Sequence, residues 1–468
     1  MKLPTVLLTL LTVSVGPAGA TAGFLPPRAQ ILSDLELANG YFTNEWGAKP
    51  GCSSCLPGSH PSCIWTRGTY FEGALALYRI NHDPAIYNYA VQWGAFTNWN
   101  LRYGDTDTQP DSQCAAQDYI ELYQFDPVQT NRLTHVVNNA NYWAGGATVS
   151  RWTSVDAIHM SMPMFAKLTA LTGNTNYSAR IYAWFHYTKS VIGPSNGLYN
   201  TNITDHLWWR DTSFLSGYKA ADGTTQKCYW SRGNGWAFAA LARTMEVLPT
   251  NDVHFAEYLQ TFQEMAAALK AVQRPDGFWN VNLAYANDCP GPESTGTACF
   301  TYGMAWGINH GYLDAPAYLP AVINGCNALA NGALHHTSDA TNGFLGYVQG
   351  TGSKPADHQP VTYNSVPDFD DFGVGLFLLA GSQVYQLSSA PGITLATPVV
   401  TGNQVQLDFT VVSSLTNATF NLLETSQLGA GWITNSTATL STNIPDYSFR
   451  FLTSNNATAC FYRIQIGP

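Results

Sequence analysis

Charged residues are scarce in this sequence, since Asp, Glu, Lys and Arg make up 11% of its 468 residues. Positive charge is the scarcer kind, with 21 Lys and Arg against 31 Asp and Glu and a formal net charge of -10. This balance offers no electrostatic footprint for nucleic acid or an anionic membrane, so we expect neither as a partner. An acidic sugar can still bind, but only in a local cationic pocket.

Long apolar runs are also missing. No segment suits a transmembrane helix, and the apolar stretch Val6–Val15 is too short to be a permanent anchor. Lys2 precedes this stretch and the small residues Ala18–Ala22 follow it, which is the order of an export signal rather than of a buried N-terminal helix. We therefore predict a signal peptide over residues 1–22. The mature protein is then secreted, whether periplasmic, bound to the cell surface or extracellular.

Complete metal-binding patterns are absent as well. Cys52-x-x-Cys55 could begin a zinc site, but no second Cys-x-x-Cys and no His-x3-His follows it. The nine cysteines of an exported chain favour disulfides, and their odd number leaves at least one thiol over. Cys289 and Cys299 flank a loop of Pro, Gly, Ser and Thr, and we predict a disulfide between them.

Aromatic residues are plentiful, with 25 Tyr, 22 Phe and 14 Trp. Such rings can stack on the flat apolar faces of sugars, although most rings in a globular protein pack in its core.

Helical periodicity dominates residues 28–386 and is interrupted by Gly, Pro and Asn. The predicted helices cover 28–44, 67–80, 84–100, 113–124, 127–143, 156–172, 176–192, 234–247, 253–273, 300–314, 317–333 and 372–387. Twelve helices in six hairpins predict an all-α (α/α)6 barrel, in which inner helices surround a funnel. Residues 197–230 interrupt the series and predict an inserted hairpin or rim loop, with a turn at Ala220-Ala221-Asp222-Gly223.

The composition changes after Ser389. Short Val, Thr, Leu and Phe alternations such as Val405–Phe409, separated by Asn, Thr, Ser and Gly turns, predict a small β-sandwich. We therefore divide the chain into the signal peptide, a catalytic domain over 23–388 and an all-β appendage over 389–468. The appendage could bind carbohydrate or act as a spacer, but a small core would consume most of its aromatic residues.

One candidate site is the segment Tyr229-Trp-Ser-Arg-Gly-Asn-Gly-Trp236, which opens a predicted helix. Its glycines allow close approach of a ligand, and a helix N-terminus favours an anion. Arg232 offers a fork for a carboxylate, and Trp230 or Trp236 offers a stacking face. The alternative is a loop-to-helix junction with Asn234 as its cap and a packed Trp.

Two carboxylates also begin predicted helices. Asp156 precedes an almost uncharged helical stretch, and Asp111 stands just before another helix. An Asp in this position is most often a helix cap. Among aromatic residues, however, the pKa of Asp156 would rise and make this residue a proton donor. Equivalent ends of inner helices would bring both carboxylates into one funnel.

These residues resemble the unsaturated glucuronyl and galacturonyl hydrolases of glycoside hydrolase family 105. The resemblance covers roughly residues 30–387 and combines six segments in the same order. They are Asp111-Ser-Gln-Cys-Ala-Ala-Gln-Asp-Tyr-Ile-Glu-Leu-Tyr123, Asp156-Ala-Ile-His-Met-Ser-Met-Pro163, Trp230-Ser-Arg-Gly-Asn-Gly-Trp236, Arg274-Pro-Asp-Gly-Phe-Trp279, Glu293-Ser-Thr-Gly-Thr-Ala-Cys-Phe300 and Phe372-Gly-Val-Gly-Leu-Phe-Leu-Leu-Ala-Gly381.

The resemblance implies an (α/α)6 barrel that uses no metal or other cofactor. Its members remove the 4,5-unsaturated uronic acid that polysaccharide lyases leave at a non-reducing end. Asp156 matches the family's proton donor, and Arg232 and Trp236 match its substrate-binding pair. Asp111 falls at or next to the second carboxylate, where Ser112 replaces an acid common in the family. Arg210 stands where some members carry His.

In this chemistry Asp156 protonates C4 of the enol ether and helps water to add at C5. Arg232 would bind the uronate carboxylate, and Trp236, Trp152 and Trp209 would form walls. The leading prediction is hydrolysis of unsaturated galacturonyl-rhamnose from the pectin rhamnogalacturonan.

Three alternatives stay open. The same chemistry could act on unsaturated glucuronyl oligosaccharides from ulvan, arabinogalactan or glycosaminoglycan. The toroid could also be a lyase or an ordinary glycosidase, or a glycan-binding protein without catalysis. The sequence leaves the oligomeric state open.

Overall fold

The computed structural model describes residues 25–46, 63–146, 152–194, 196–202, 205–365 and 371–388, and parts of the C-terminal region. Those parts are residues 394–395, 398–410, 419–426, 432–443, 448–454 and 461–466. The chain divides after Leu387 into a helical unit and a β unit. The predicted signal peptide and the Cys52-x-x-Cys55 pair lie outside the described residues.

Twelve α-helices occur in the described part of the helical unit. They are α1 (Arg28–Trp46), α2 (Trp65–Asn81), α3 (Pro84–Phe96), α4 (Pro110–Phe125), α5 (Thr134–Gly146), α6 (Asp156–Thr172), α7 (Thr175–Ser190), α8 (Ser231–Met245), α9 (Phe255–Ala271), α10 (Ser294–Asn309), α11 (Ala315–Asn327) and α12 (Asp371–Leu387). Each overlaps one predicted helix.

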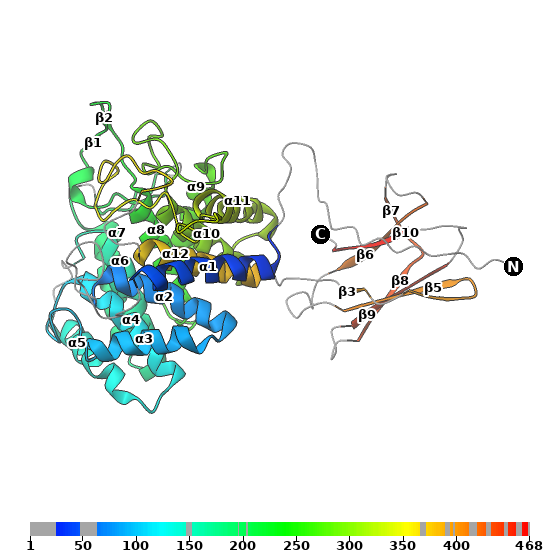
Figure 1. Cartoon of the computed structure of the whole chain (residues 1–468), viewed down its shortest axis with the longest axis horizontal. Coiled ribbons are helices and arrows are strands. Elements are labelled where there is room, and N and C mark those ends of the chain that lie inside the picture. The colour runs from blue at the N-terminus through cyan, green and yellow to red at the C-terminus, as the bar shows by residue number, and fades with distance from the viewer. Residues whose placement is uncertain are drawn as a thin grey trace. The chain divides into compact units, whose positions relative to one another are not determined.

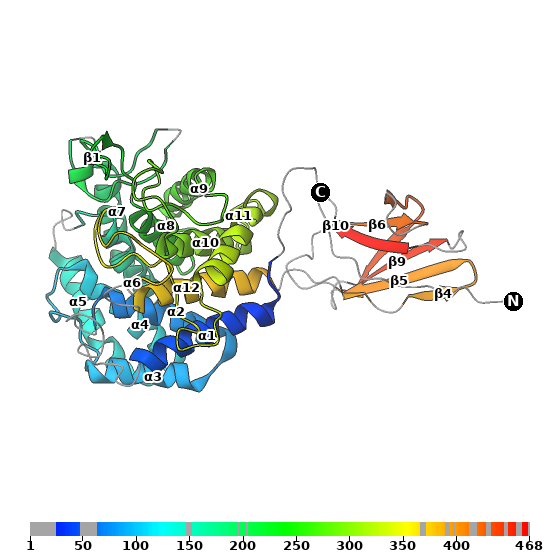
Figure 2. The same cartoon turned by 45° about the horizontal axis from the view of Figure 1, so that its top comes forward.

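The even-numbered helices form a closed inner ring. Each packs on the next, from α2 through α4, α6, α8 and α10 to α12, which packs back on α2. The odd-numbered helices lie outside this ring, and each of them contacts an inner helix next to it in the sequence, or, for α1, the last one, α12. In Figures 1 and 2, α3, α5, α9 and α11 lie at the periphery of the helical unit, around the inner helices. The predicted (α/α)6 barrel is confirmed.

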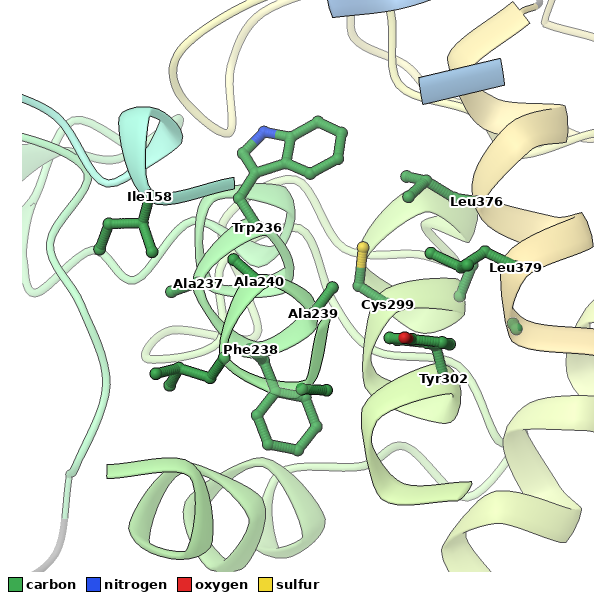
Figure 3. Packing of buried hydrophobic residues seen from close by; sticks show 14 of the residues in the cluster. Ile158, Trp236, Ala237, Phe238, Ala239, Ala240, Cys299, Tyr302, Leu376 and Leu379 are labelled. Carbon is green, nitrogen blue, oxygen red and sulfur yellow. The ribbon is translucent and has the colours of Figure 1, made fainter. Parts of the chain in front are cut away.

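Small residues let the inner helices approach closely. A Cβ on Gly73 of α2 would lie 2.0 Å from the carbonyl oxygen of Gly375 in α12, so only glycine fits at this crossing. All residues of α8 are buried, and Figure 3 shows its alanines Ala237, Ala239 and Ala240 at the centre of the packing. The ring is therefore a solid core below the helix N-termini.

The interruption between α7 and α8 contains the predicted hairpin. Strands β1 (Tyr218–Lys219) and β2 (Thr225–Gln226) pair antiparallel around the predicted Gly223 turn.

The described residues of the β unit form two sheets. The first has β6 (Phe420–Thr425) between β10 (Phe461–Ile466) and β7 (Ile433–Thr434). The second follows the order β3 (Thr394–Leu395), β5 (Gln404–Thr410), β9 (Ser448–Ser454) and β8 (Thr439–Asn443), with β4 (Val399–Thr401) also paired to β5. Phe409, Phe420, Phe449 and Phe451 are buried in its core, as expected for a small all-β domain.

The predicted disulfide between Cys289 and Cys299 is wrong, because both thiols are free. Cys299 is buried inside α10, where it faces Gly235 of α8. Cys289 stays in the loop before α10, with its thiol 3.9 Å from Asp288. The helix begins inside the stretch that was interpreted as a loop, and this carries Cys299 into the barrel core.

Candidate active site

A cavity of about 560 Å³ lies where four inner helices begin. Trp65 of α2, Asp111 of α4, Asp156 of α6 and Arg232 of α8 line it, each within the first two residues of its helix. The partial positive charge of helix N-termini stabilises carboxylates and attracts an anionic ligand. The other lining residues are Gln109, Pro110, Thr153, Ser154, Ala157, Met160, Arg210, Asp211, Thr212, Trp230, Trp236, Thr351 and Gly352.

Asp156 forms an ion pair with Arg210. The Nε of Arg210 donates to Oδ2 of Asp156 at 2.8 Å, and its Nη1 donates to Oδ2 of Asp211 at 2.8 Å. Two main-chain contacts fix this arrangement: the amide of Val155 donates to the carbonyl of Arg210 at 2.9 Å, and Ser154 bridges to Asp211. The segment before α8 thus presents its cation to the first residue of α6.

Asp111 is the second carboxyl group of the cavity. Burial raises its pKa to about 6, and the negative charge of Asp156 adds to this effect, while Arg210 opposes it. A carboxyl whose pKa is raised in this way keeps its proton and can act as a general acid. Asp111 therefore keeps its proton at mildly acidic pH, and Asp156 lines the same cavity. The structure brings Asp111 and Asp156 into one cavity, as the helix-end argument predicted.

Arg232 was predicted to offer a free guanidinium group to a carboxylate of the ligand, and the structure shows a different arrangement. It is buried, and its Nη1 and Nη2 donate to the carbonyls of Gln349 and Gly350, each at 2.6 Å. Its guanidinium lies 4.7 Å from the ring centre of Trp230 and 5.1 Å from that of Phe372. Burial lowers its pKa, against the opposing charges of Glu293 and Asp156. Arg232 lines the cavity, but it also fastens the loop that forms one wall.

Trp236 also lines the cavity. Its ring packs 4.5 Å from the ring of His159 and 5.9 Å from Trp65. His159 Nε2 lies 3.1 Å from Glu72 Oε2, in a buried cluster with Arg243. Burial opposes the charge of Glu72, but Arg243 and His159 hold its pKa well below the usual range. This charged cluster therefore packs, through His159, against a ring that lines the cavity.

Two predicted walls are not in the cavity lining. Trp152 is buried against Trp184, with ring centres 5.3 Å apart, and its carbonyl accepts a hydrogen bond from Thr188. Trp209 packs on Tyr229 at the edge of the core. Both follow the rule that most rings pack inside, and proximity in sequence to Asp156 and Arg210 was misleading.

Asn234 is not the cap of α8, because the helix begins three residues earlier, at Ser231. Its side chain instead accepts a hydrogen bond from the amide of Trp208 at 2.8 Å and donates one to the carbonyl of Trp208 at 3.0 Å. This anchors the segment that carries Arg210.

The sequence reasoning missed the wall that follows α11. Gln349 accepts a hydrogen bond from Trp230 Nε1 at 2.9 Å and donates to the carbonyls of Lys354, Pro355 and Asp357. It thereby shapes the turn that puts Thr351 and Gly352 into the cavity. No periodicity or motif marks this loop, and only the contact with Arg232 and Trp230 reveals it.

Among the described residues, no group of three His, Cys, Asp or Glu lies together as metal ligands would. Within the same part of the chain, no helix has both the length and the apolar character of a membrane span.

An (α/α)6 barrel with paired carboxylates at the inner helix ends is an architecture of glycoside hydrolases. Residues 40–388 match the sequence family described as Glycosyl Hydrolase Family 88. The chain belongs to this family and is a glycoside hydrolase.

Individual comparisons agree with this assignment. An unsaturated 3S-rhamnoglycuronyl hydrolase from Formosa agariphila is 27% identical over 69% of this chain and 84% of its own. The solved structure of a family 88 glycosyl hydrolase from Bacteroides vulgatus is 30% identical, with a TM-score of 0.67 over 77% of this chain and 99% of that one. The solved structure of a possible family 105 member from Salmonella enterica shares the fold, with a TM-score of 0.61 and 17% sequence identity. The match covers 81% of this chain and 100% of that one. The family resemblance predicted from the motifs is confirmed.

Proposed function

We propose that this protein removes a 4,5-unsaturated uronic acid from the non-reducing end of oligosaccharides made by polysaccharide lyases. The observation that carries the proposal is the pair Asp111 and Asp156, a carboxyl that retains a proton beside a carboxylate at the ends of two inner helices. The family match and the name of the Formosa relative support the same reaction.

The reaction is a hydration that ends in cleavage. Asp156 transfers the proton shared with Asp111 to C4, and the electrons of the C4=C5 double bond form the new C–H bond. The positive charge left at C5 is shared with the ring oxygen. Water adds to C5 and gives a proton back to the carboxylate pair, which restores it. The resulting hemiketal opens to a ketone at C5, and C1 then releases the next sugar.

The substrate class follows from the chemistry of the lyase. Elimination at C4 removes the stereocentre that distinguishes galacturonate from glucuronate, so both give the same unsaturated residue. Discrimination must then come from the following sugar and its linkage. Rhamnose follows in the rhamnogalacturonan predicted from the sequence, and the name of the Formosa relative also joins rhamnose to a glycuronyl group. We therefore propose an unsaturated uronate linked to rhamnose, and a secreted enzyme that meets such fragments outside the cytoplasm.

The test follows ultraviolet absorbance of the conjugated double bond in four substrates: unsaturated galacturonyl-rhamnose, unsaturated glucuronyl-rhamnose, an unsaturated glucuronyl-hexosamine and a saturated control. The proposal predicts loss of absorbance with at least one of the rhamnose-linked substrates and no cleavage of the saturated one. Faster turnover of the hexosamine substrate would keep the reaction and overturn the rhamnose assignment. A protein that binds these sugars but leaves every double bond intact would overturn the reaction.

A further inference from the structure

Two arginines line the cavity among its described residues, and they differ in how freely they can meet a ligand. The side chain of Arg210 is 26% exposed, whereas Arg232 is 1% exposed. Both terminal nitrogens of Arg232 already bind main-chain carbonyls. Turning Arg232 toward a ligand would leave two buried carbonyls without those donors, which is costly.

Arg210 is bound to side chains instead of main chain. Its two hydrogen bonds go to the carboxylates of Asp156 and Asp211, and its Nη2 has no hydrogen-bond partner in the described part of the chain. A carboxylate of a ligand can replace a carboxylate of the protein with little change in geometry, because the planar guanidinium binds either one in the same way. Arg210 can therefore exchange partners without unpairing the backbone.

This exchange matters because the partner that Arg210 would leave is Asp156. While Arg210 is bound, its guanidinium donates to one oxygen of Asp156 and balances the charge of this carboxylate. Once Arg210 moves away, Asp156 stands beside the protonated Asp111 without a counter-charge. The proton of Asp111 can then pass to Asp156: the O–H bond of Asp111 breaks, and an O–H bond forms on Asp156.

We infer that Arg210 binds the carboxylate of the unsaturated uronate and releases Asp156 in doing so, so that substrate binding itself prepares the proton donor. The inference rests on the proposed function and adds to it a residue for carboxylate recognition. It transfers that part from Arg232, which the family resemblance implied, to the arginine that stands where some members carry His.

The charged groups around this pair set the expected pH behaviour. Asp111 experiences charges from Asp156, Arg210, Arg102 and Asp107, and Asp156 also acts on Arg232. Arg210 lowers the pKa of Asp111, so loss of this cation lets the pair keep its proton to higher pH. In a variant that lacks the charge of Arg210, the alkaline limb of the kcat/KM profile should therefore shift to higher pH.

The test compares an unsaturated uronyl disaccharide with its methyl ester, which lacks the negative charge. Wild type is expected to prefer the acid by roughly 100-fold in kcat/KM, the effect of a partly buried charge pair. Arg210→Gln should lower kcat/KM on the acid far more than on the ester, so that the preference disappears. Arg450→Gln is the matched control, because it removes an Arg–Asp pair in the β unit, with a bond of 2.6 Å to Asp408.

The outcomes separate the inference from the proposed function. If Arg210→Gln keeps the preference for the acid, Arg210 does not bind the carboxylate and the inference is wrong. If this variant does not fold, Arg210→Lys carries the test: its preference should fall about tenfold, because Lys lacks the fork, and an unchanged preference would overturn the inference. If wild type consumes no unsaturated uronide at all, the proposed function itself fails.

Discussion

The raised pKa of Asp111 predicts where activity is lost as pH rises. Burial, together with the charge of Asp156, raises this pKa from 3.8 to about 6. The shift of roughly two units corresponds to about 3 kcal/mol favouring the protonated form. Because kcat/KM reports the free enzyme, it should be constant below about pH 6 and fall tenfold per unit above it. A carboxyl with an ordinary pKa would place this limb about two units lower.

The assay measures loss of absorbance at substrate concentrations well below KM, between about pH 4 and pH 8. The carboxylate of the substrate stays ionised over most of this range, so the limb reports the protein. Asp276→Asn is the control, since Asp276 pairs with Arg274 outside the cavity and should leave the profile unchanged. Asp111→Asn should lower kcat/KM at least about 100-fold. A rate already falling tenfold per unit from about pH 4 would refute the buried, shared proton.

Further predictions concern the ring and the missed wall. Gly73→Ala should cost about 3 kcal/mol in urea unfolding, because its Cβ would meet the backbone of α12 at 2.0 Å and cannot rotate away. Gly40→Ala in α1, with nothing within 4 Å of its Cβ, should cost nothing; equal stability of the two variants would contradict the close crossing. Gln349→Ala should reduce kcat/KM roughly 10-fold or more, because Trp230 and three carbonyls lose their partner. The same change at Gln359, which donates to the carbonyl of Pro355 and accepts from the amide of Val361, should be mild, and comparable losses would argue against a wall held by Gln349.

Helices with strong end signals were predictable from sequence. The range of α6 agrees at both ends, because Asp156 opens an apolar helical pattern and Gly173 closes it at a φ of 70°. By contrast, α10 begins six residues before its predicted start at residue 300. Glu293 caps it by accepting from the amides of Thr295 and Gly296, but the small polar residues that follow show no apolar period. Interpreting that stretch as a loop also produced the wrong disulfide.

The candidate site was predictable only as far as it sits on helix ends. Asp111, Asp156, Arg232 and Trp236 line the cavity because the (α/α)6 topology gathers the beginnings of inner helices. The hydrogen bonds of Arg232 go to the loop at Gln349, and no local sequence pattern connects this loop to Arg232.

For the same reason, a motif could not separate a ring that lines the cavity from one that packs in the core. Trp230 and Trp152 show the two outcomes. The contact that fixes Trp230 joins it to Gln349, 119 positions further along the chain.

The most direct test of the account compares wild type with Asp156→Asn on unsaturated uronyl-rhamnose, by following absorbance of the double bond. Asn keeps the shape of the side chain and cannot donate the proton. The account predicts that wild type removes the absorbance and that the variant is at least about 100-fold slower, with its fold intact by circular dichroism. Equal rates for the two proteins would contradict the assignment of Asp156 as the proton donor.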